Sequence, residues 1–113
     1  MVQILKRKDI VLVSFPFSDQ SGSKKRPVVV VSRDNFNEHS PDLIVCPMTS
    51  NIDNDYYTIY VKSEDWKNGM YSESCIKAGN IFAIDKKIMG QKIGYLSGDR
   101  FNEVIGKIQE ILK

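Results

Sequence analysis

Apolar and β-branched residues gather along the chain in short stretches separated by polar or glycine-containing segments. Stretches of this length and composition predict β-strands. The expected strands cover residues 9–17, 27–32, 42–48, 56–62, 73–78 and 80–84, with a further short one over 91–96. Residues 18–25 contain no apolar side chain and include Gly22, so we expect a polar loop between the first two strands.

The side-chain pattern within two of these strands indicates how they are buried. Residues 28–31 are four consecutive valines, which indicates burial on both faces of the strand. In residues 56–62 every second side chain is apolar, and the side chains between them include Thr58 and Tyr60. Such alternation is typical of a strand with one buried face and one exposed face.

The C-terminal segment has the clearest helical pattern. Its apolar side chains follow the spacing of a single helix face. They are Phe101, Val104, Ile105, Ile108, Ile111 and Leu112. Ser97 or Asp99 is expected to cap this helix, and packing on the protein's own sheet is favoured over a membrane or partner helix. Asp34 or Ser32 could also cap one short helical turn, which would end at Pro41.

The order of the expected elements defines the fold class. Five to seven short strands precede one long helix, and there is no alternation of strands and helices. This order indicates a mostly β protein with some α structure, built as a small, mostly antiparallel sheet or barrel with a helix closing one side. The length of 113 residues fits one domain, so residues 1–113 are expected to form a single unit.

The distribution of charge is more informative than its total. The formal net charge is only +2, which does not by itself indicate binding to nucleic acid. Basic residues are nevertheless concentrated in two places, at residues 6–8 and 24–26. Either cluster could contact phosphate, and either could equally consist of solvated side chains at strand ends or in a loop.

Several classes of protein are disfavoured by the composition. Cys46 and Cys75 both lie in apolar runs and are expected to be buried, reduced thiols rather than a disulfide framework. The single His39 cannot form a multi-histidine metal site, and neither a metal nor a cofactor is expected. No apolar run approaches about 18 residues, and the N-terminus is too poor in apolar residues for a signal peptide. A cytoplasmic location is therefore expected.

Arg26 and Thr49 each stand where a polar segment meets the end of an apolar strand. The guanidinium group stays charged at any working pH and offers several N–H donors to phosphate oxygens. A hydroxyl group at a strand end can donate a further hydrogen bond to the same oxygens. RNA carries its own nucleophile, the 2′-hydroxyl, so one arginine, one hydroxyl and a groove for single-stranded RNA would suffice for cleavage.

The same residues also have ordinary structural explanations. An arginine before a proline is commonly a loop residue, and Thr49-Ser50 after a strand is commonly a turn. His39 is a conceivable general base, but its segment is polar and an exposed or helix-end position is favoured. Cys46 lacks a partner that would activate it as a nucleophile.

The order of motifs along the chain resembles the MazF/PemK family, the toxins of type II toxin–antitoxin modules. The resemblance begins with a strand over residues 9–15, a polar loop containing glycine, and Lys25-Arg26-Pro27 before the valines. It continues with the Pro-x-Thr-Ser motif at residues 47–50, Ile-Asp-Lys at residues 84–86 and the terminal helix. The likeness covers nearly the whole chain.

This resemblance implies a small SH3-like barrel that forms a homodimer and cleaves single-stranded RNA at selected sequences without a metal. It implies that Arg26 acts in proton transfer and phosphate stabilisation and that Thr49 hydrogen-bonds the phosphate, leaving a 2′,3′-cyclic phosphate and a 5′-hydroxyl. It further implies inhibition by a cognate antitoxin, in a complex that binds operator DNA. The expected RNA-binding residues are Phe17, Asp19, Gln20, Ser21, Lys24, Lys25, Ser50 and Asn80. A core or dimer role for Phe17 is equally compatible with the sequence.

The chain departs from the family pattern in one place. Many members have Arg-Thr before Ile-Asp-Lys, whereas this chain has Phe82-Ala83. The change removes a cation and a hydroxyl from the expected RNA groove, so it bears on target sequence more than on activity. Two alternatives to a ribonuclease remain: a gyrase poison of the CcdB type, which shares the fold, and a non-catalytic RNA-binding barrel.

Overall fold

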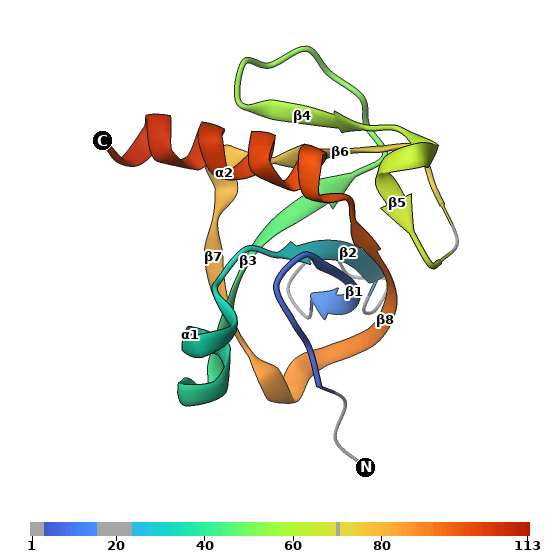
Figure 1. The fold of residues 1–113 in the computed structure, drawn as a ribbon. Helices are drawn as coiled ribbons and strands as arrows, with labels where there is room; N and C mark the ends of the chain where they lie inside the picture. The colour runs from blue at the N-terminus through green and yellow to red at the C-terminus, as the bar shows by residue number, and fades with distance from the viewer. Residues whose placement is uncertain (1–3, 16–23, 70) are drawn as a thin grey trace.

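The computed structural model describes residues 4–15, 24–69 and 71–113 (Figure 1). Its two α-helices are α1 (Asp34–His39) and α2 (Gly98–Leu112), and single 3₁₀ turns occur at η1 (Ser63–Asp65), η2 (Ala78–Asn80) and η3 (Lys86–Ile88). The strands in this part of the chain are β1 (Asp9–Phe15), β2 (Lys24–Val30), β3 (Asp42–Thr49), β4 (Thr58–Val61), β5 (Trp66–Lys67), β6 (Ser74–Lys77), β7 (Phe82–Asp85) and β8 (Met89–Leu96).

The described strands form one antiparallel sheet that curls into a nearly closed barrel. Their order is β4-β6-β3-β2-β1-β8-β5, and β7 pairs with β3 beside β6. Figure 1 shows β1, β2, β3, β7 and β8 arranged in a ring, with α2 lying across the side that faces β4 and β6. The expected small antiparallel barrel with a terminal helix is confirmed, and the two-residue β5 is the one strand that the sequence pattern did not predict.

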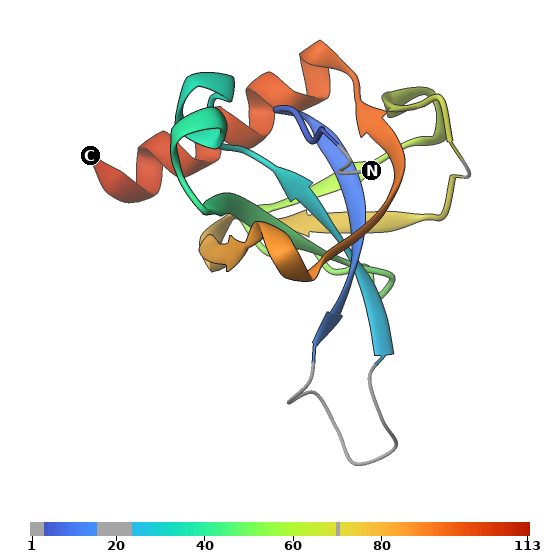
Figure 2. The same ribbon diagram turned by 90° about the horizontal axis from the view of Figure 1, so that it is seen from below.

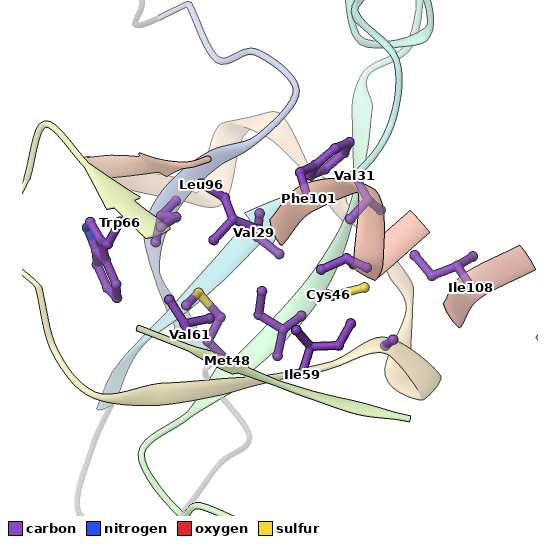
Figure 3. Close-up of a cluster of buried hydrophobic side chains, with 14 residues drawn as sticks. Val29, Val31, Cys46, Met48, Ile59, Val61, Trp66, Leu96, Phe101 and Ile108 are labelled. Atoms are coloured by element: carbon purple, nitrogen blue, oxygen red, sulfur yellow. The ribbon is translucent and has the colours of Figure 1, made fainter. Parts of the chain in front are cut away.

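Strands β1, β2 and β3 are buried on both faces because they separate two apolar clusters. Along β2, Val29 belongs to the larger cluster, which lies under α2, whereas Val28 and Val30 belong to the smaller one inside the barrel. Strand β3 alternates in the same way, with Cys46 on the first face and Val45 on the second. Figure 3 shows the larger cluster between these strands, β4 and α2. Burial of both faces explains the unbroken run of valines.

Helix α2 confirms the predicted apolar stripe and cap. Its buried residues are Phe101, Val104 and Ile108, and the Ser97 hydroxyl accepts a hydrogen bond from the Arg100 backbone N–H at 3.3 Å. The apolar stripe is no longer buried at the C-terminal end of the helix, where Leu112 is 70% exposed.

The first basic cluster, residues 6–8, packs against this helix. The Arg7 guanidinium lies 4.8 Å from the centroid of the Phe101 ring, and Lys8 Nζ lies 5.9 Å from it. The Arg7 side chain also donates to the Val31 carbonyl at 3.2 Å. The cation–π contacts hold the N-terminal segment against α2, and the hydrogen bond holds it to the residue after β2. These two side chains therefore have a structural role.

Several predicted strand boundaries were wrong by one to three residues, and so was the cap predicted for α1. Strand β2 starts at Lys24 rather than at Pro27, because its pairing with β1 continues to Phe15 opposite Lys24. The α1 turn was predicted correctly, but neither Ser32 nor Asp34 caps it, since the N-cap position is Arg33. The Ser32 hydroxyl instead accepts from the Ile44 N–H at 3.0 Å and donates to the Asn37 side chain.

Within the described residues, no helix is long and apolar enough to span a membrane.

Two glycines provide a matched test of the β8 geometry. Gly94 has φ +139°, and an added Cβ would lie 2.5 Å from Trp66 Nε1 and 2.7 Å from the Lys67 carbonyl oxygen. Gly94→Ala should therefore lower the free energy of unfolding by about 2–3 kcal/mol. Gly106→Ala, in the middle of α2, should raise it by about 0.5–1 kcal/mol, because outside its own helix backbone and its two chain neighbours the new Cβ would meet no atom within 4 Å. Urea unfolding followed by circular dichroism measures both, and equal midpoints would contradict the strain at Gly94.

Candidate functional site

The register between β2 and β3 indicates that Arg26 and Thr49 lie near each other. The last bridged pair is Val28 opposite Pro47, and continuing the antiparallel pairing by two residues puts Arg26 opposite Thr49. Arg26 lies on the same face of β2 as Val28, and Thr49 on the same face of β3 as Pro47, because side chains alternate along a strand. Directly opposed side chains in a sheet have Cβ atoms about 5 Å apart. The guanidinium and the hydroxyl can therefore reach one ligand.

Both side chains emerge where the apolar core ends. Arg26 is exposed, and on its other side β2 pairs it with Val13 of β1. Thr49 is half-buried, and its hydroxyl oxygen accepts a hydrogen bond from the Asn51 N–H at 3.1 Å. This turn uses one lone pair of the hydroxyl and leaves its proton available to donate to a bound anion. Figure 2 shows that the ends of β1 and β2 extend beyond the rest of the barrel. Arg26 is the third residue of β2.

Further side chains lie in line with Thr49 across the sheet, and together they make up a row. Thr49 is opposite Cys75 of β6, and Cys75 is opposite Tyr60 of β4. Tyr60 is 38% exposed, and its hydroxyl donates to Glu73 Oε2 at 2.6 Å. That hydrogen bond is the main reason why the pKa of Tyr60 is raised well above its usual value. Thr49, Cys75 and Tyr60 therefore form one row on one face of β3, β6 and β4. The continued β2–β3 register adds Arg26 at the Thr49 end of this row.

A further cation lies on the same face, one step along β6. Lys77 shares the face of Cys75, and its ammonium group pairs with the Asp53 carboxylate at 3.1 Å. The pKa of Asp53 is below its usual value, mainly because the carboxylate accepts a hydrogen bond from the Asp55 N–H and also because Lys77 lies beside it. This contact anchors the loop that follows Thr49 to β6.

Two other predicted site residues, Lys25 and Asn80, do not lie in this row. Lys25 is exposed, but strand alternation directs it to the face opposite Arg26. Asn80 is exposed in η2, beside the middle of β3 rather than its Thr49 end, because its neighbours Ile76 and Phe82 pair with Met48 and Val45.

The other predicted RNA-binding residues are Ser50, Lys24 and four positions of the β1–β2 connection. Ser50 is exposed directly after Thr49. The backbone of Lys24 lies in β2. The four positions of the β1–β2 connection lie outside the described residues, namely Phe17, Asp19, Gln20 and Ser21.

The sequence interpretation did not identify Tyr60, Glu73 or Lys77 as site residues. Alternation in residues 56–62 had placed Tyr60 on an exposed face, but only the pairing of β3 with β6 and of β6 with β4 shows that this is the face of Thr49. Glu73 and Lys77 carried no local signal, because each is a single charged residue beside a short apolar run.

Two residues considered for other chemistry are not part of the row's exposed surface. His39 is exposed at the end of α1, with Nδ1 2.8 Å from the Asn35 carbonyl oxygen, as expected for a helix-end histidine. Cys46 and Cys75 are both free and fully buried. Among the described residues, no group of three or more His, Cys, Asp and Glu side chains is arranged to hold a metal ion.

Comparison with known proteins gives a consistent match. Residues 6–112 match the family described as PemK-like, MazF-like toxin of type II toxin–antitoxin system. The chain is 31% identical over 104 residues to Endoribonuclease MazF from Staphylococcus saprophyticus, covering 89% of this chain and 85% of the relative.

Solved structures share the fold at lower identity. A MazE-MazF structure from Deinococcus radiodurans superposes with a TM-score of 0.82 at 19% identity, over 97% of both chains. An endoribonuclease in complex with its cognate antitoxin from Mycobacterial species gives 0.81 at 16% identity, over 96% of this chain and 95% of that one.

The packing of the two cysteines can be tested directly. Burial raises the pKa of the Cys46 thiol to about 12, so only about one part in ten thousand is thiolate at pH 8. We expect Ellman's reagent to label neither thiol of the native protein at pH 8 within the time that labels both in denaturant. A Cys75→Ser variant assigns any reaction to one site. Rapid labelling of native Cys46 would contradict the packing and restore it as a candidate nucleophile.

Proposed function

Because the chain belongs to the PemK-like, MazF-like toxin family of type II toxin–antitoxin systems, we propose that it is a metal-independent endoribonuclease acting on single-stranded RNA through Arg26 and Thr49. The observation that supports this assignment of residues is the β2–β3 register, which ends at Val28 opposite Pro47. If the pairing is continued by two residues, Arg26 and Thr49 come to lie opposite each other on one face. Both lie beyond the buried part of their strands, where a polyanion can approach.

The proposed reaction is a transesterification within the RNA. The 2′-hydroxyl loses its proton as its oxygen bonds to the adjacent phosphorus, the bond from phosphorus to the 5′ oxygen breaks, and that oxygen gains a proton. The products are a 2′,3′-cyclic phosphate and a 5′-hydroxyl. Arg26 neutralises the charge that accumulates on the phosphoryl oxygens and takes part in the proton transfer, and Thr49 donates a hydrogen bond to the same oxygens.

The remaining predicted residues extend this site into a groove. Ser50 follows Thr49 and is proposed to hydrogen-bond the RNA backbone. Lys24 and Lys25 precede Arg26 in the chain and are proposed to contact phosphate, Lys25 from the other face of β2. Asn80 is proposed to contact a base. We assign the loop residues to closing over the RNA and selecting its sequence, with Phe17 stacking on a base. These residues are Phe17, Asp19, Gln20 and Ser21.

The proposed biological setting follows from the family. The relatives include a toxin structure with its cognate antitoxin and MazE-MazF structures. We propose that this chain is one domain that forms a homodimer in the cytoplasm, is inhibited by its own antitoxin, and binds operator DNA as part of that complex. A disordered antitoxin segment lying along the groove would block access to Arg26.

Removal of the guanidinium should abolish cleavage without unfolding the protein. Arg26→Ala should lower kcat/KM on a long RNA by about 10²–10³-fold or more, because the developing phosphoryl charge loses its main donor. Arg26→Lys should recover only part of this, since an ammonium group lacks the planar fork. Cleavage is measured in a chelating buffer by mapping 5′ ends, with circular dichroism as the check on folding.

Arg33→Ala is the matched control, because Arg33 is also exposed but precedes α1. It should cleave like the parent protein. A gyrase-poisoning mechanism would be supported instead if Arg26→Ala still inhibits growth and neither this variant nor the parent protein produces new RNA ends.

Loss of the Thr49 hydroxyl should have a smaller effect on the same reaction. Thr49→Ala is expected to lower kcat by about 10–100-fold because one hydrogen bond to the phosphoryl oxygens is lost. Thr49→Ser keeps the hydroxyl and should retain most of the activity. Equal activity of Thr49→Ala and the parent protein would remove Thr49 from the site.

A further inference from the structure

An exposed aromatic ring and a carboxylate lie in line with Thr49, on the side away from Arg26. Tyr60 and Thr49 are each opposite Cys75, so they occupy the same face of β4 and β3, separated by one strand. Cys75 itself has no exposed surface. A ligand bound along the row would therefore contact Thr49 and Tyr60 but not the thiol between them.

The distance along the row decides which part of a substrate Tyr60 could meet. Neighbouring strands lie about 4.8 Å apart, so Tyr60 stands on the order of 10 Å from Thr49. That is too far for contact with the phosphate held by Thr49 and Arg26. It matches the base of a flanking nucleotide on the same strand of RNA.

The tyrosine is held in place by its surroundings. Its hydroxyl donates to Glu73, which is diagonally opposite on the same face of the β4–β6 pair. The next residue along β4 is held as well, because the Tyr71 hydroxyl donates to the Val61 carbonyl at 2.9 Å. The Tyr71 ring packs edge-on against the buried Trp66, with centroids 5.8 Å apart. A ring held in this way loses little conformational entropy when a base stacks on it.

Glu73 gives this position a chemical preference. A carboxylate accepts hydrogen bonds at two oxygens with about four lone-pair sites, so Glu73 retains acceptor capacity when one oxygen binds the Tyr60 hydroxyl. Guanine presents two adjacent donors, N1–H and N2–H, on its Watson–Crick edge, and these match a carboxylate. Uracil presents a single N–H between two carbonyl oxygens, which a carboxylate repels. Unpaired bases are the ones that protein side chains can read in this way.

We propose that Tyr60 and Glu73 form a base-binding subsite in which Tyr60 stacks on a nucleotide flanking the scissile phosphate and Glu73 selects guanine there. This inference rests on the proposed ribonuclease function, and it assigns part of the sequence selectivity to β4 and β6 rather than to the β1–β2 connection.

The test combines cleavage-site mapping with kinetics on the full-length protein. The parent protein should cut a long RNA at sites with guanine at one fixed flanking position. Tyr60→Ala should raise KM on a short RNA containing that site roughly 5- to 100-fold with kcat largely kept, because stacking is lost. Glu73→Gln should reduce the preference for guanine over uracil at that position by roughly tenfold, and Tyr60→Phe should retain most of the affinity.

Matched variants separate the subsite from general effects of surface mutation. Tyr95 is 39% exposed on β8, so Tyr95→Ala removes an equally exposed tyrosine elsewhere on the barrel. Glu110 accepts from the Tyr56 hydroxyl at 2.9 Å, so Glu110→Gln repeats the Glu73 change in another tyrosine–carboxylate pair. Both controls should cleave the same sites with unchanged KM.

The outcomes distinguish this inference from the proposed function. If Arg26→Ala is inactive while Tyr60→Ala and Glu73→Gln cleave like the parent protein, the subsite is wrong and the ribonuclease stands. Variants that cleave normally but resist neutralisation by an antitoxin would show a protein-binding face instead, and would also overturn the subsite.

If the parent protein cleaves no RNA, binding of short 2′-O-methyl RNA oligonucleotides, which lack the nucleophile, decides the question. Tighter binding of guanine-containing than of uracil-containing oligonucleotides, lost in Tyr60→Ala, would support the subsite without the nuclease. If the parent protein and Tyr60→Ala bind both kinds of oligonucleotide equally weakly, the base-binding subsite and the proposed ribonuclease function are both overturned.

Discussion

Burial of β1, β2 and β3 on both faces is the constraint on which the rest of the structure depends. In the central part of these strands, apolar side chains enter the cluster under α2 from one face and the barrel interior from the other. A polar side chain can appear only where a strand leaves this double core, since burying a charge without a partner is costly. Arg26 and Thr49 are the first polar side chains beyond the core on their face of β2 and β3. The core thus determines where the chemistry can be placed.

The same architecture reconciles a nearly neutral chain with a polyanionic substrate. A net charge of +2 provides little long-range attraction, so the binding of RNA has to depend on where the charges lie. Arg7 and Lys8 are engaged with Phe101 on the α2 side. Arg26 and Lys77 lie on the face that carries the row. Arg7 and Lys8 of the first basic cluster thus stabilise the fold, whereas Arg26 of the second is exposed.

Sequence patterns predicted the elements whose signals are local. The apolar stripe of α2, its Ser97 cap and the double burial of β2 depend on neighbouring residues, and each was confirmed. The start of β2 at Lys24 was missed because polar residues extend a strand only when a partner strand continues beside them. The position of Tyr60 in line with Thr49 could not be predicted, since it depends on two strand registers between distant segments. Polar positions of this kind are fixed by tertiary pairing and leave no periodic trace.

The four valines of residues 28–31 have a less obvious consequence for the register of the sheet. Because these side chains are apolar on both faces, sliding β2 by one residue along β3 would keep them all buried, so hydrophobicity alone barely distinguishes the two alignments. The slipped sheet would present Lys25 in place of Arg26. Ser32 discriminates between them, since its hydroxyl and backbone N–H bind the N–H and carbonyl of Ile44. The hydrogen bonds of this serine at the far end of the strand thus favour the register that sets Arg26, rather than Lys25, opposite Thr49.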